Sequence, residues 1–552
     1  MTITKPWTML GLLAVLSLLF AAASATEPLV DLRYTQYQGK ALPNGISQWL
    51  GIRYAAPPLG PLRFSAPRDP EEVYGVQDAS QHGSLCIPTN EYPVPAGTSE
   101  DCLFLDVYAP TQFPGVSRNL LPVYVFIQGG GFNSNGNPYY DGSGLIQASN
   151  MGIVVVNFNY RVGPYGFLSG EEVLKDGGVN NGLKDQIKVL EWVQKHIREF
   201  GGDPDRVVIG GDSAGAASIT LHLSAHNGRD DGLFHAAAAE SQSFAPMLTV
   251  DETQFAYDNL VTRTGCNSAA DTLACLRSLD IATLQRANII TPLPGAREPP
   301  LYLYGPVVDG DLIPDYTYRL FEEGHFIKVP VIFGDVTNEG TEFVPQNLTS
   351  ISAVNSFLHA QFPALTPAHL SRIEQYYLQN INAAELFPNA TRYWRPASNA
   401  YGELRYNCPG IAMSTAYAAA NIPSWNYHYS VLDPEDEATG LGVYHVVDLN
   451  AIWGPENMWW SEDVSSPPPD SYRTSNAPIV EVMQGYWTSF IRDFDPNTYR
   501  YPGSPKWETW YGKQGGNQRL FIRTGETRME SVPPDQRERC EYLISIGVEL
   551  TQ

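Results

Sequence analysis

Basic residues are scarce in this 552-residue sequence, and their scarcity restricts its partners. The chain contains 35 lysines and arginines against 59 aspartates and glutamates, which gives a formal net charge of -24 at pH 7. A protein that binds nucleic acid or an anionic membrane needs a basic face to neutralise phosphates. The composition therefore argues against both of these partners.

Long hydrophobic runs are also absent, except near the N-terminus. There, Lys5 precedes the apolar run Met9–Phe20, which the small residues Ala23-Ser24-Ala25 follow. This run is too short to span a bilayer, and the small-x-small pattern is typical of a secretory signal peptide. We therefore predict a signal peptide over residues 1–25 and a secreted, extracellular mature protein with no membrane span.

Linkers, internal repeats and low-complexity blocks are missing as well. Nothing in the composition divides the chain, so we predict one large domain over residues 26–552. Its glycine-rich segment is not accompanied by a Gly-x-Gly-x-x-Gly or Gly-Lys-Ser/Thr pattern, which argues against a nucleotide phosphate site. The sequence implies no metal and no cofactor.

Cysteine is rare, and its even number favours full pairing in a secreted chain. Six thiols permit fifteen connectivities, but two pairs would close short local loops and the remaining pair would form a long-range bridge. We expect these bridges to be structural rather than catalytic. The expected pairs are Cys86 with Cys102, Cys266 with Cys275, and Cys408 with Cys540.

Two segments match the acceptor pattern for N-linked glycans. They are Asn347-Leu348-Thr349 and Asn389-Ala390-Thr391. The pattern matters only because the predicted signal peptide directs the chain into a glycosylating route. We expect both asparagines at the surface.

Continuously apolar, strand-like runs alternate with helical patterns along the chain. Continuous hydrophobicity indicates strands buried on both faces, as in a mostly parallel sheet covered by helices. Between two of these runs, apolar residues from Leu183 to Phe200 recur every three or four positions, which predicts an amphipathic crossover helix. The pattern predicts an α/β fold that binds ligands at the carboxyl ends of its strands. The runs are Val123–Ile127, Ile153–Phe158, Arg206–Ile209, Ala236–Ala239, Val329–Phe333 and Trp425–Tyr429.

One turn in this pattern carries a candidate nucleophile. Gly211-Asp212-Ser213-Ala214-Gly215 follows the apolar run Val207–Ile209 and precedes a small-residue helical run, Ala216–Ile219. A Gly-x-Ser-x-Gly turn between a strand and a helix is typical of a nucleophile elbow, because the glycines let the chain reverse tightly and leave the hydroxyl clear. We therefore predict Ser213 as the nucleophile.

A serine nucleophile needs a general base, and folds of this kind order the groups as serine, acid, histidine. His359 and His369 lie in helix-like segments and His428 in a strand-like run, where packing or surface roles are expected. His445 ends the loop Thr439–His445, whose two glycines give it the freedom to orient an imidazole. We predict His445 as the base, with another histidine as the alternative.

The acid that orients this base has two candidates. The segment Phe333–Gly340 continues from a strand-like run and contains both Asp335 and Glu339. Either side chain is placed to project from the loop at the end of the strand, and either one also suits a helix cap or a solvated loop. Spacing does not separate the two.

A run of glycines upstream is suited to binding an oxyanion. Gln128-Gly129-Gly130-Gly131-Phe132 follows the strand-like run Val123–Ile127. Successive glycines let backbone N–H groups converge on an anion without obstruction by side chains. We predict that the N–H groups of Gly130 and Gly131 hold the developing alkoxide together with that of Ala214.

These motifs resemble those of a known family. Phe200–Pro204 followed by Val207–Gly215 resembles the serine signature of the type-B carboxylesterase and lipase family of α/β-hydrolases, and Glu100–Val107 resembles its second signature. The family is related to cholinesterases and to fungal secreted lipases, and the resemblance extends nearly end to end. It implies a large, mostly parallel central sheet covered by helices on both faces.

The resemblance also implies a role for each site residue. It assigns Ser213 as nucleophile, His445 as base and Glu339, rather than Asp335, as acid, with the oxyanion donors named above. It further implies the two local disulfides. The implied structural ion pairs are Arg63 with Glu100 and Arg161 with Asp185.

Several features depart from the family pattern. Asp212 stands where most relatives have glutamate, and Gln128 stands where histidine or an aromatic residue often precedes the glycines. The loop between Cys86 and Cys102 has no tryptophan, which argues against a choline site, and it is too short for a large lid, which favours soluble or short-chain esters. Three tryptophans suit either a pocket wall or, more commonly, the core. They are Trp453, Trp459 and Trp460.

The sequence thus predicts a secreted serine hydrolase that cleaves a small-molecule or lipid ester through an acyl-enzyme. Two alternatives remain at this point. One is a non-catalytic binding protein that keeps the fold, and the other is an acyltransferase that uses the same residues with an alcohol in place of water.

Overall fold

The computed structural model describes residues 28–111, 119–136, 140–379, 381, 387, 389–458, 469–511 and 516–552. The predicted signal peptide, residues 1–25, lies outside these ranges, as do Trp459 and Trp460. No helix within the described ranges combines the length and the apolar character that a membrane span requires.

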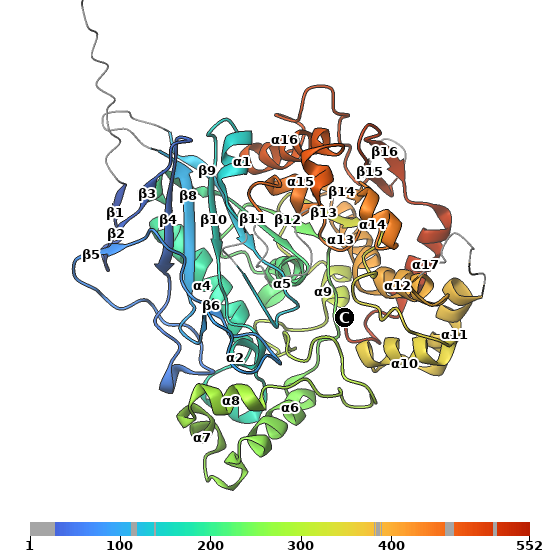
Figure 1. The fold of residues 1–552 in the computed structure, drawn as a ribbon, viewed down its shortest axis with the longest axis horizontal. Helices are drawn as coiled ribbons and strands as arrows, with labels where there is room; N and C mark the ends of the chain where they lie inside the picture. The colour runs from blue at the N-terminus through green and yellow to red at the C-terminus, as the bar shows by residue number, and fades with distance from the viewer. Residues whose placement is uncertain are drawn as a thin grey trace, which may run out of the picture.

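A central sheet of eleven strands dominates the described part of the chain (Figure 1). The strands from β10 across to β15 run parallel, whereas β8, β4 and β3 at one edge and β16 at the other pair antiparallel. The prediction of a mostly parallel sheet is therefore confirmed, with antiparallel pairing confined to the strands at its two edges. In spatial order the strands are β16 (Arg528–Ser531), β15 (Gln518–Ile522), β14 (Ser424–Tyr429), β13 (Val331–Val336), β12 (Ala236–Glu240), β11 (Gly202–Asp212), β9 (Leu121–Ile127), β10 (Val154–Phe158), β8 (Phe104–Pro110), β4 (Ile46–Arg53) and β3 (Lys40–Ala41).

The central strands are buried on both faces, as their continuous hydrophobicity predicts. In β9, Val123, Val125 and Ile127 belong to one core cluster, while Tyr124 and Phe126 between them belong to another. Because successive side chains of a strand point to opposite faces, these two clusters are the two layers between the sheet and its helices. The fold is therefore a three-layer α/β sandwich.

Helices cover both faces. The layer that contains Val123 packs against α4 (Asn181–His196), α5 (Ala214–Gly228), α9 (Thr317–Glu322) and α13 (Cys408–Ala419). The opposite layer packs against α1 (Ser143–Ala148), α15 (Leu449–Trp453) and α16 (Ala477–Asp493). The predicted crossover helix is α4, which passes into a 3-10 turn at Ile197–Phe200.

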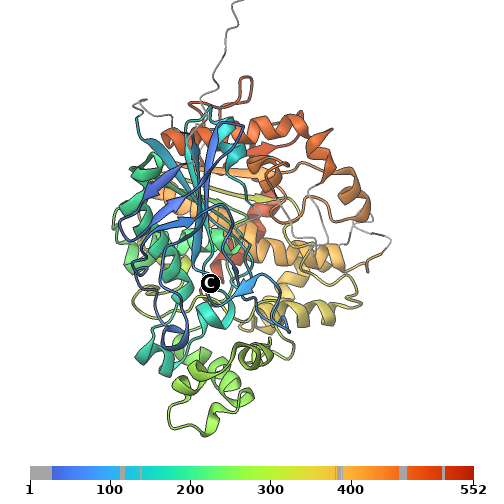
Figure 2. The same cartoon turned by 60° about the vertical axis from the view of Figure 1, so that its left-hand side comes forward.

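Two helical groups lie beside this sandwich. The helices α6, α7 and α8 form a lobe at one end of the molecule, and both views show them apart from the sheet (Figure 2). A third core cluster joins α10, α11, α12 and α17. The bounds of these helices and of the remaining short elements are α2 (Gly163–Phe167), α3 (Glu171–Asp176), α6 (Val250–Arg263), α7 (Thr272–Ser278), α8 (Ile281–Ala287), α10 (Ile351–Gln361), α11 (Pro367–Ile373), α12 (Trp394–Gly402), α14 (Pro434–Thr439), α17 (Pro534–Ser545), β1 (Leu29–Asp31), β2 (Gln36–Gln38), β5 (Val76–Asp78), β6 (Leu85–Cys86) and β7 (Thr98–Ser99).

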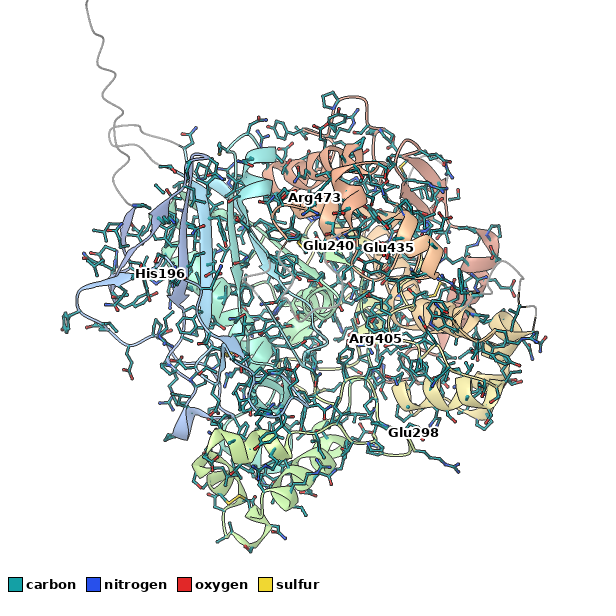
Figure 3. The ribbon with its side chains drawn as sticks, viewed as in Figure 1. His196, Glu240, Glu298, Arg405, Glu435 and Arg473 are labelled. Carbon is teal, nitrogen blue, oxygen red and sulfur yellow. A yellow bond between two sulfur atoms is a disulfide. The ribbon has the colours of Figure 1, made fainter. Side chains whose placement is uncertain are left out.

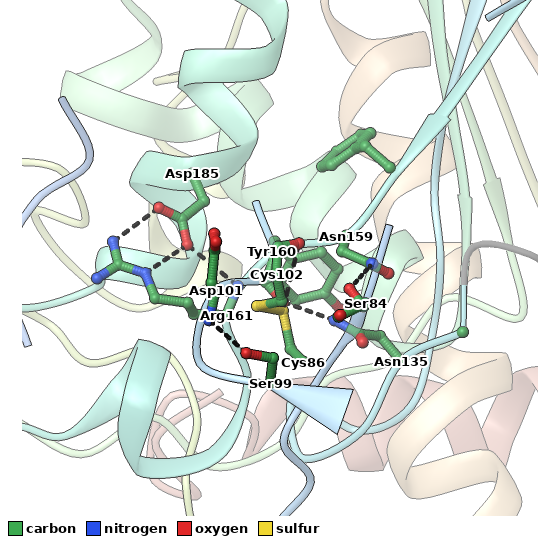
Figure 4. The surroundings of a disulfide bond; sticks show 12 residues. Ser84, Cys86, Ser99, Asp101, Cys102, Asn135, Asn159, Tyr160, Arg161 and Asp185 are labelled. Carbon is green, nitrogen blue, oxygen red and sulfur yellow. Dashed lines mark hydrogen bonds and ion pairs between the residues drawn. A yellow bond between two sulfur atoms is a disulfide. The ribbon is translucent and has the colours of Figure 1, made fainter. Parts of the chain in front are cut away.

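Covalent and ionic links join the strands of the N-terminal half to this frame. Cys86 and Cys102 form a disulfide, and Arg161 beyond β10 donates to both carboxylate oxygens of Asp185 in α4 (Figure 4). The Arg161–Asp185 pair is almost completely buried. The other bridges and the second ion pair that the sequence suggested are also present, namely Cys266–Cys275, Cys408–Cys540 and Arg63–Glu100.

Candidate active site

The elbow at Ser213 is a strained and tightly packed turn. Ser213 has φ 53° and ψ -116°, a conformation that residues with a side chain rarely adopt. A Cβ atom placed on Gly215 would lie 1.8 Å from the carbonyl oxygen of Ile127, and one on Gly211 would lie 2.6 Å from the same atom. Only glycine therefore fits on either side of the serine, and the turn presents Ser213 at the end of β11.

The sheet brings two other loops to the same edge. Ser213 follows β11, Glu339 follows β13, and His445 follows β14, and these strands run parallel in one sheet with β12 between β11 and β13. Their carboxyl ends therefore lie along one edge. The loops after β13 and β14 are joined directly, because Asn338 N–H donates to the carbonyl of Val443 at 2.8 Å and the Asn338 side chain accepts from Val443 N–H at 3.0 Å.

This bridge between the loops places the histidine against the glutamate. His445 Nδ1 lies 2.5 Å from Glu339 Oε2, and the second glutamate oxygen accepts the N–H of Val336 at 2.8 Å. Both side chains are buried, and the rings of Tyr406 and Phe343 pack around the imidazole, with centroids 4.5 and 5.0 Å away. His445 Nε2 has no hydrogen-bond partner among the described residues, so this nitrogen is available to a reacting group.

The alternative candidates lie elsewhere. Asp335 is buried in β13, where one of its oxygens has no hydrogen-bond partner in the described part of the chain, and no ion pair joins it to a described histidine. His428 lies in β14 and pairs with Glu530 at 3.0 Å. His359 and His369 lie in α10 and α11, as their helix-like patterns predict. The structure thus pairs His445 with Glu339 and leaves Asp335 apart.

The glycine loop after β9 is built to expose backbone donors. Gly130 and Gly131 have φ 106° and 61°, which favour glycine, and neither their N–H groups nor that of Ala214 donates to another described residue. Gln128 anchors the loop, since its Nε2 donates to the carbonyl of Phe158 at 2.7 Å. Ala214 also begins α5, whose N-terminal dipole favours negative charge.

Asp212 connects this loop to the elbow. Its Oδ1 accepts the N–H of Gly129 at 2.8 Å, so the aspartate next to Ser213 binds the first glycine of the glycine loop. Burial raises the pKa of Asp212 to about 6, against the opposing effects of this hydrogen bond and of His445. The shorter aspartate at this position therefore still reaches the glycine loop.

Further carboxyl groups lie buried beneath the site. Glu240, at the end of β12, accepts from Trp487 Nε1 at 2.8 Å and from the Tyr124 hydroxyl at 3.2 Å. Asp448, just before α15, accepts from the Tyr427 hydroxyl at 2.6 Å. Burial, together with a smaller effect of the charge of Glu339, raises the pKa of Asp448 to about 7, against the opposing hydrogen bond from Tyr427 and the charge of His445.

We expect Asp448→Asn to stabilise the protein at pH 8 by on the order of 4 kcal/mol, because about 3 pKa units separate folded and unfolded Asp448. Between about pH 4 and pH 7, Asp448 keeps its proton in the folded protein but loses it in the unfolded chain. The contribution of Asp448 to the free energy of unfolding therefore falls as pH rises through this range. Asparagine resembles the protonated acid and still accepts from Tyr427. Urea unfolding at pH 4.5 and pH 8 measures the difference.

The gain should therefore be present at pH 8 and small at pH 4.5. Asp311→Asn, which changes an exposed carboxylate, serves as the control and should alter neither value by more than about 0.5 kcal/mol. An equal gain at both pH values would contradict the proposed cost of a buried charge at Asp448.

A cavity opens beside the glycine loop and the start of α5. Gly131 and Ala214 are among the residues that line it, and its walls also include Phe244, Tyr302 and Arg405. The Tyr302 ring packs directly on Gly131, where an added Cβ atom would lie 2.3 Å from the ring. A ligand atom held by the glycine loop would therefore lie next to this cavity.

The sequence carried no signal for several of these residues. Tyr302, Arg405 and Asp448 belong to no motif, and they reach the site only through packing between distant segments. Trp453 is fully buried in the core, the more common of its two expected roles. The candidate glycan acceptors Asn347 and Asn389 both have exposed side chains.

Comparisons with known proteins agree with this architecture. A model of the carboxylesterase family matches residues 26–541. "Secreted lipase 4" of Gibberella zeae is 33% identical over 516 residues, which cover 89% of this chain and 87% of the lipase. "Fumonisin B1 esterase" of Sphingopyxis macrogoltabida is 33% identical over 498 residues, which cover 88% of this chain and 85% of the esterase.

A solved structure matches as well. The crystal structure of Aspergillus niger EstA superposes with a TM-score of 0.89 at 42% sequence identity, and the match covers 95% of this chain and 99% of that chain. A match of this quality over nearly the whole of both chains shows that the two structures share their fold. On these grounds the chain belongs to the carboxylesterase family and is a carboxylic ester hydrolase with an α/β-hydrolase fold.

Proposed function

We propose that the chain hydrolyses carboxylic esters by a Ser-His-Glu triad through an acyl-enzyme intermediate. His445 Nε2 takes the proton of the Ser213 hydroxyl as the oxygen attacks the ester carbonyl. Glu339, through its hydrogen bond to Nδ1, holds the imidazole in the tautomer whose Nε2 is free to accept, and stabilises the imidazolium that forms.

The glycine loop supplies the electrophilic part of the site. As the carbonyl oxygen gains negative charge, the N–H groups of Gly130, Gly131 and Ala214 donate to it, and each such donor lowers the barrier by about 3 to 4 kcal/mol. His445 then protonates the departing alcohol. Water, deprotonated by the same imidazole, attacks the acyl group on Ser213, and the acid is released.

The observation that carries this proposal is the hydrogen bond between His445 Nδ1 and Glu339 Oε2 at 2.5 Å, formed at the sheet edge that also carries the strained Ser213 turn. A histidine whose Nδ1 is held by a buried carboxylate and whose Nε2 is unpartnered among the described residues has the geometry of a general base. Ser213 is partly exposed, as a nucleophile must be.

Labelling with an organophosphonate ester tests the assignment. The probe phosphonylates an activated serine, so we expect one adduct per chain, on the peptide that contains Ser213, with complete loss of nitrophenyl ester hydrolysis. Peptide mapping by mass spectrometry measures the site. Labelling of another serine, or none in protein whose circular dichroism spectrum is native, would overturn the assignment.

We also propose the domain boundaries and the location of this enzyme. We infer that residues 1–25 are a signal peptide, that residues 26–552 form one hydrolase domain, and that the mature protein is secreted. The named relatives include secreted lipases, and the exposed Asn347 and Asn389 lie where glycans would be accommodated. The substrates would be small-molecule or lipid esters.

A further inference from the structure

Arg405 is a buried arginine without a carboxylate partner. Its side chain lies inside the molecule (Figure 3), and the residue is only 7% exposed. Arg63, Arg161 and Arg519 are buried to a similar degree, and each forms an ion pair with a glutamate or aspartate. Among the described residues, no carboxylate forms an ion pair with Arg405.

The surroundings of Arg405 hold the guanidinium without neutralising it. Its Nε donates to Ser243 Oγ at 3.3 Å, and the guanidinium carbon lies 5.6, 5.9 and 5.7 Å from the ring centroids of Tyr302, Tyr401 and Tyr406. The nearby Glu403 is occupied, because both of its oxygens accept from Arg539. A buried charge without a counter-ion is costly, and aromatic faces compensate for it only in part.

The local backbone directs this residue toward the cavity. Arg405 lies in a π-helical turn, Glu403–Asn407, inserted between α12 and α13, and such turns occur frequently at functional sites. Arg405 lines the cavity that Gly131 and Ala214 also line. Tyr302 spans the distance between them, since its ring packs on Gly131 at one side and near the guanidinium at the other.

The position of this cavity identifies the part of the ester that it would hold. The alcohol oxygen must reach His445 Nε2 to take its proton, so the alcohol lies on the histidine side of Ser213. His445 does not line the cavity, whereas two of the proposed oxyanion donors do. The cavity is therefore on the acyl side, with apolar walls that include Phe244 and Leu221 and a cation at Arg405.

We propose that Arg405 binds a carboxylate on the acyl part of the substrate, so that the enzyme prefers half-esters of dicarboxylic acids over neutral esters. The proposal rests on the proposed role of Ser213 as nucleophile. The half-ester acylates Ser213 as the alcohol leaves with a proton from His445, and water then releases the dicarboxylate. Arginine suits this role because its planar fork matches a carboxylate with two parallel hydrogen bonds.

Two chromogenic esters of the same shape test the proposal. One is 4-nitrophenyl hydrogen adipate, whose free carboxylate is too distant to attack its own ester efficiently. The other is 4-nitrophenyl 6-methylheptanoate, in which an isopropyl group replaces that carboxylate. For the wild-type protein we expect a higher kcat/KM for the adipate. In Arg405→Met the ratio of the two kcat/KM values should fall by about 50-fold, which is the loss of a charge-assisted bidentate contact.

Two further variants separate recognition from packing. Arg405→Lys keeps the charge but loses the fork, so its ratio should fall by about 5- to 10-fold. Arg372→Met is the matched control, because Arg372 also stacks on a tyrosine but lies exposed on α11, and its ratio should not change. Equal losses on both esters in Arg405→Met would show that Arg405 only supports the fold and would overturn the proposal.

Binding without turnover keeps this test separate from that of the triad. Free adipate should raise the Tm of the wild-type protein more than the neutral adipamide does, and this difference should disappear in Arg405→Met. A protein that binds adipate through Arg405 but hydrolyses neither ester would refute the proposed function and keep the anion site. A wild-type protein with no preference for adipate in either assay would refute the anion site alone.

Discussion

Ser213→Ala is expected to lower kcat for a nitrophenyl ester by about 10⁵-fold or more. The variant keeps the cavity and the backbone donors but has no oxygen to form the acyl-enzyme. Only binding and the oxyanion site would remain to accelerate the reaction, and in serine hydrolases these leave a small residual rate over water. Steady-state kinetics with a short-chain nitrophenyl ester, on protein freed of any wild-type enzyme, measures the effect.

Ser213→Gly provides the control for folding. Ser213 has φ 53° and ψ -116°, where glycine is far less strained, so this variant should be equally inactive yet more stable than wild type by about 1 to 2 kcal/mol. Inactivity combined with a higher free energy of unfolding cannot arise from loss of structure. Residual turnover above about 1% of wild type in either variant would show that another group performs the attack.

Glu339→Gln should lower kcat by about 10⁴-fold while leaving KM for a neutral ester nearly unchanged. The backbone determines how the new amide lies, because the N–H of Val336 donates to Glu339 Oε1 and requires an acceptor there. The glutamine oxygen therefore occupies that position and its NH₂ group faces His445 Nδ1. An amide donor at this place favours the imidazole tautomer with its proton on Nε2, which cannot accept the serine proton.

Asp335→Asn is the matched control for this prediction. Asp335 was the other acid that spacing allowed, and it lies four residues earlier, at the end of the same strand. His445 pairs with Glu339, and no ion pair joins His445 to Asp335 among the described residues, so we expect less than a 10-fold change in kcat. If Asp335→Asn lost as much activity as Glu339→Gln, the assignment of the acid would be wrong. Pre-steady-state measurement of the nitrophenol burst would show whether acylation is the step that slows.

The elbow illustrates how stability and function conflict at this site. The turn stores strain at Ser213, and a carboxyl that is expensive to ionise, Asp448, lies buried beneath it. Close packing compensates, since Gly215 leaves no room for a Cβ atom against Ile127. In the proposed mechanism, backbone donors held in fixed positions stabilise the developing charge without rearranging.

Much of the fold followed from local patterns. The runs Val123–Ile127 and Ile153–Phe158 became central strands, because uninterrupted hydrophobicity leaves no face that tolerates water. The strand predicted at Arg206–Ile209 is longer in the structure, Gly202–Asp212. The polar residues and glycines at its ends have little strand propensity, and they are extended because they pair with neighbouring strands. The antiparallel edges likewise depend on pairing, which periodicity does not encode.

The site divides in the same way. The Ser213 turn could be predicted, because its glycines act on residues that neighbour them in the sequence. The choice between Asp335 and Glu339 could not be predicted from spacing, because it depends on which side chain faces His445. Family resemblance favoured Glu339. Arg405 had no signal at all, because the proposal for it depends on the lack of a carboxylate ion-pair partner among the described residues, and only the packing of the chain reveals that.

The sequence by itself determined the elements and the residue types available for chemistry: buried parallel strands, a glycine-flanked serine, a glycine loop and the pairs of cysteines. The tertiary structure alone decided which groups meet, by aligning the carboxyl ends of β11, β13 and β14 and joining the loops after β13 and β14 through Asn338. The physical reason is the distance along the chain over which each kind of interaction acts. Backbone conformation and hydrophobic periodicity act over a few residues, whereas a proton relay or an unpaired buried charge is defined by atoms that lie a hundred or more residues apart.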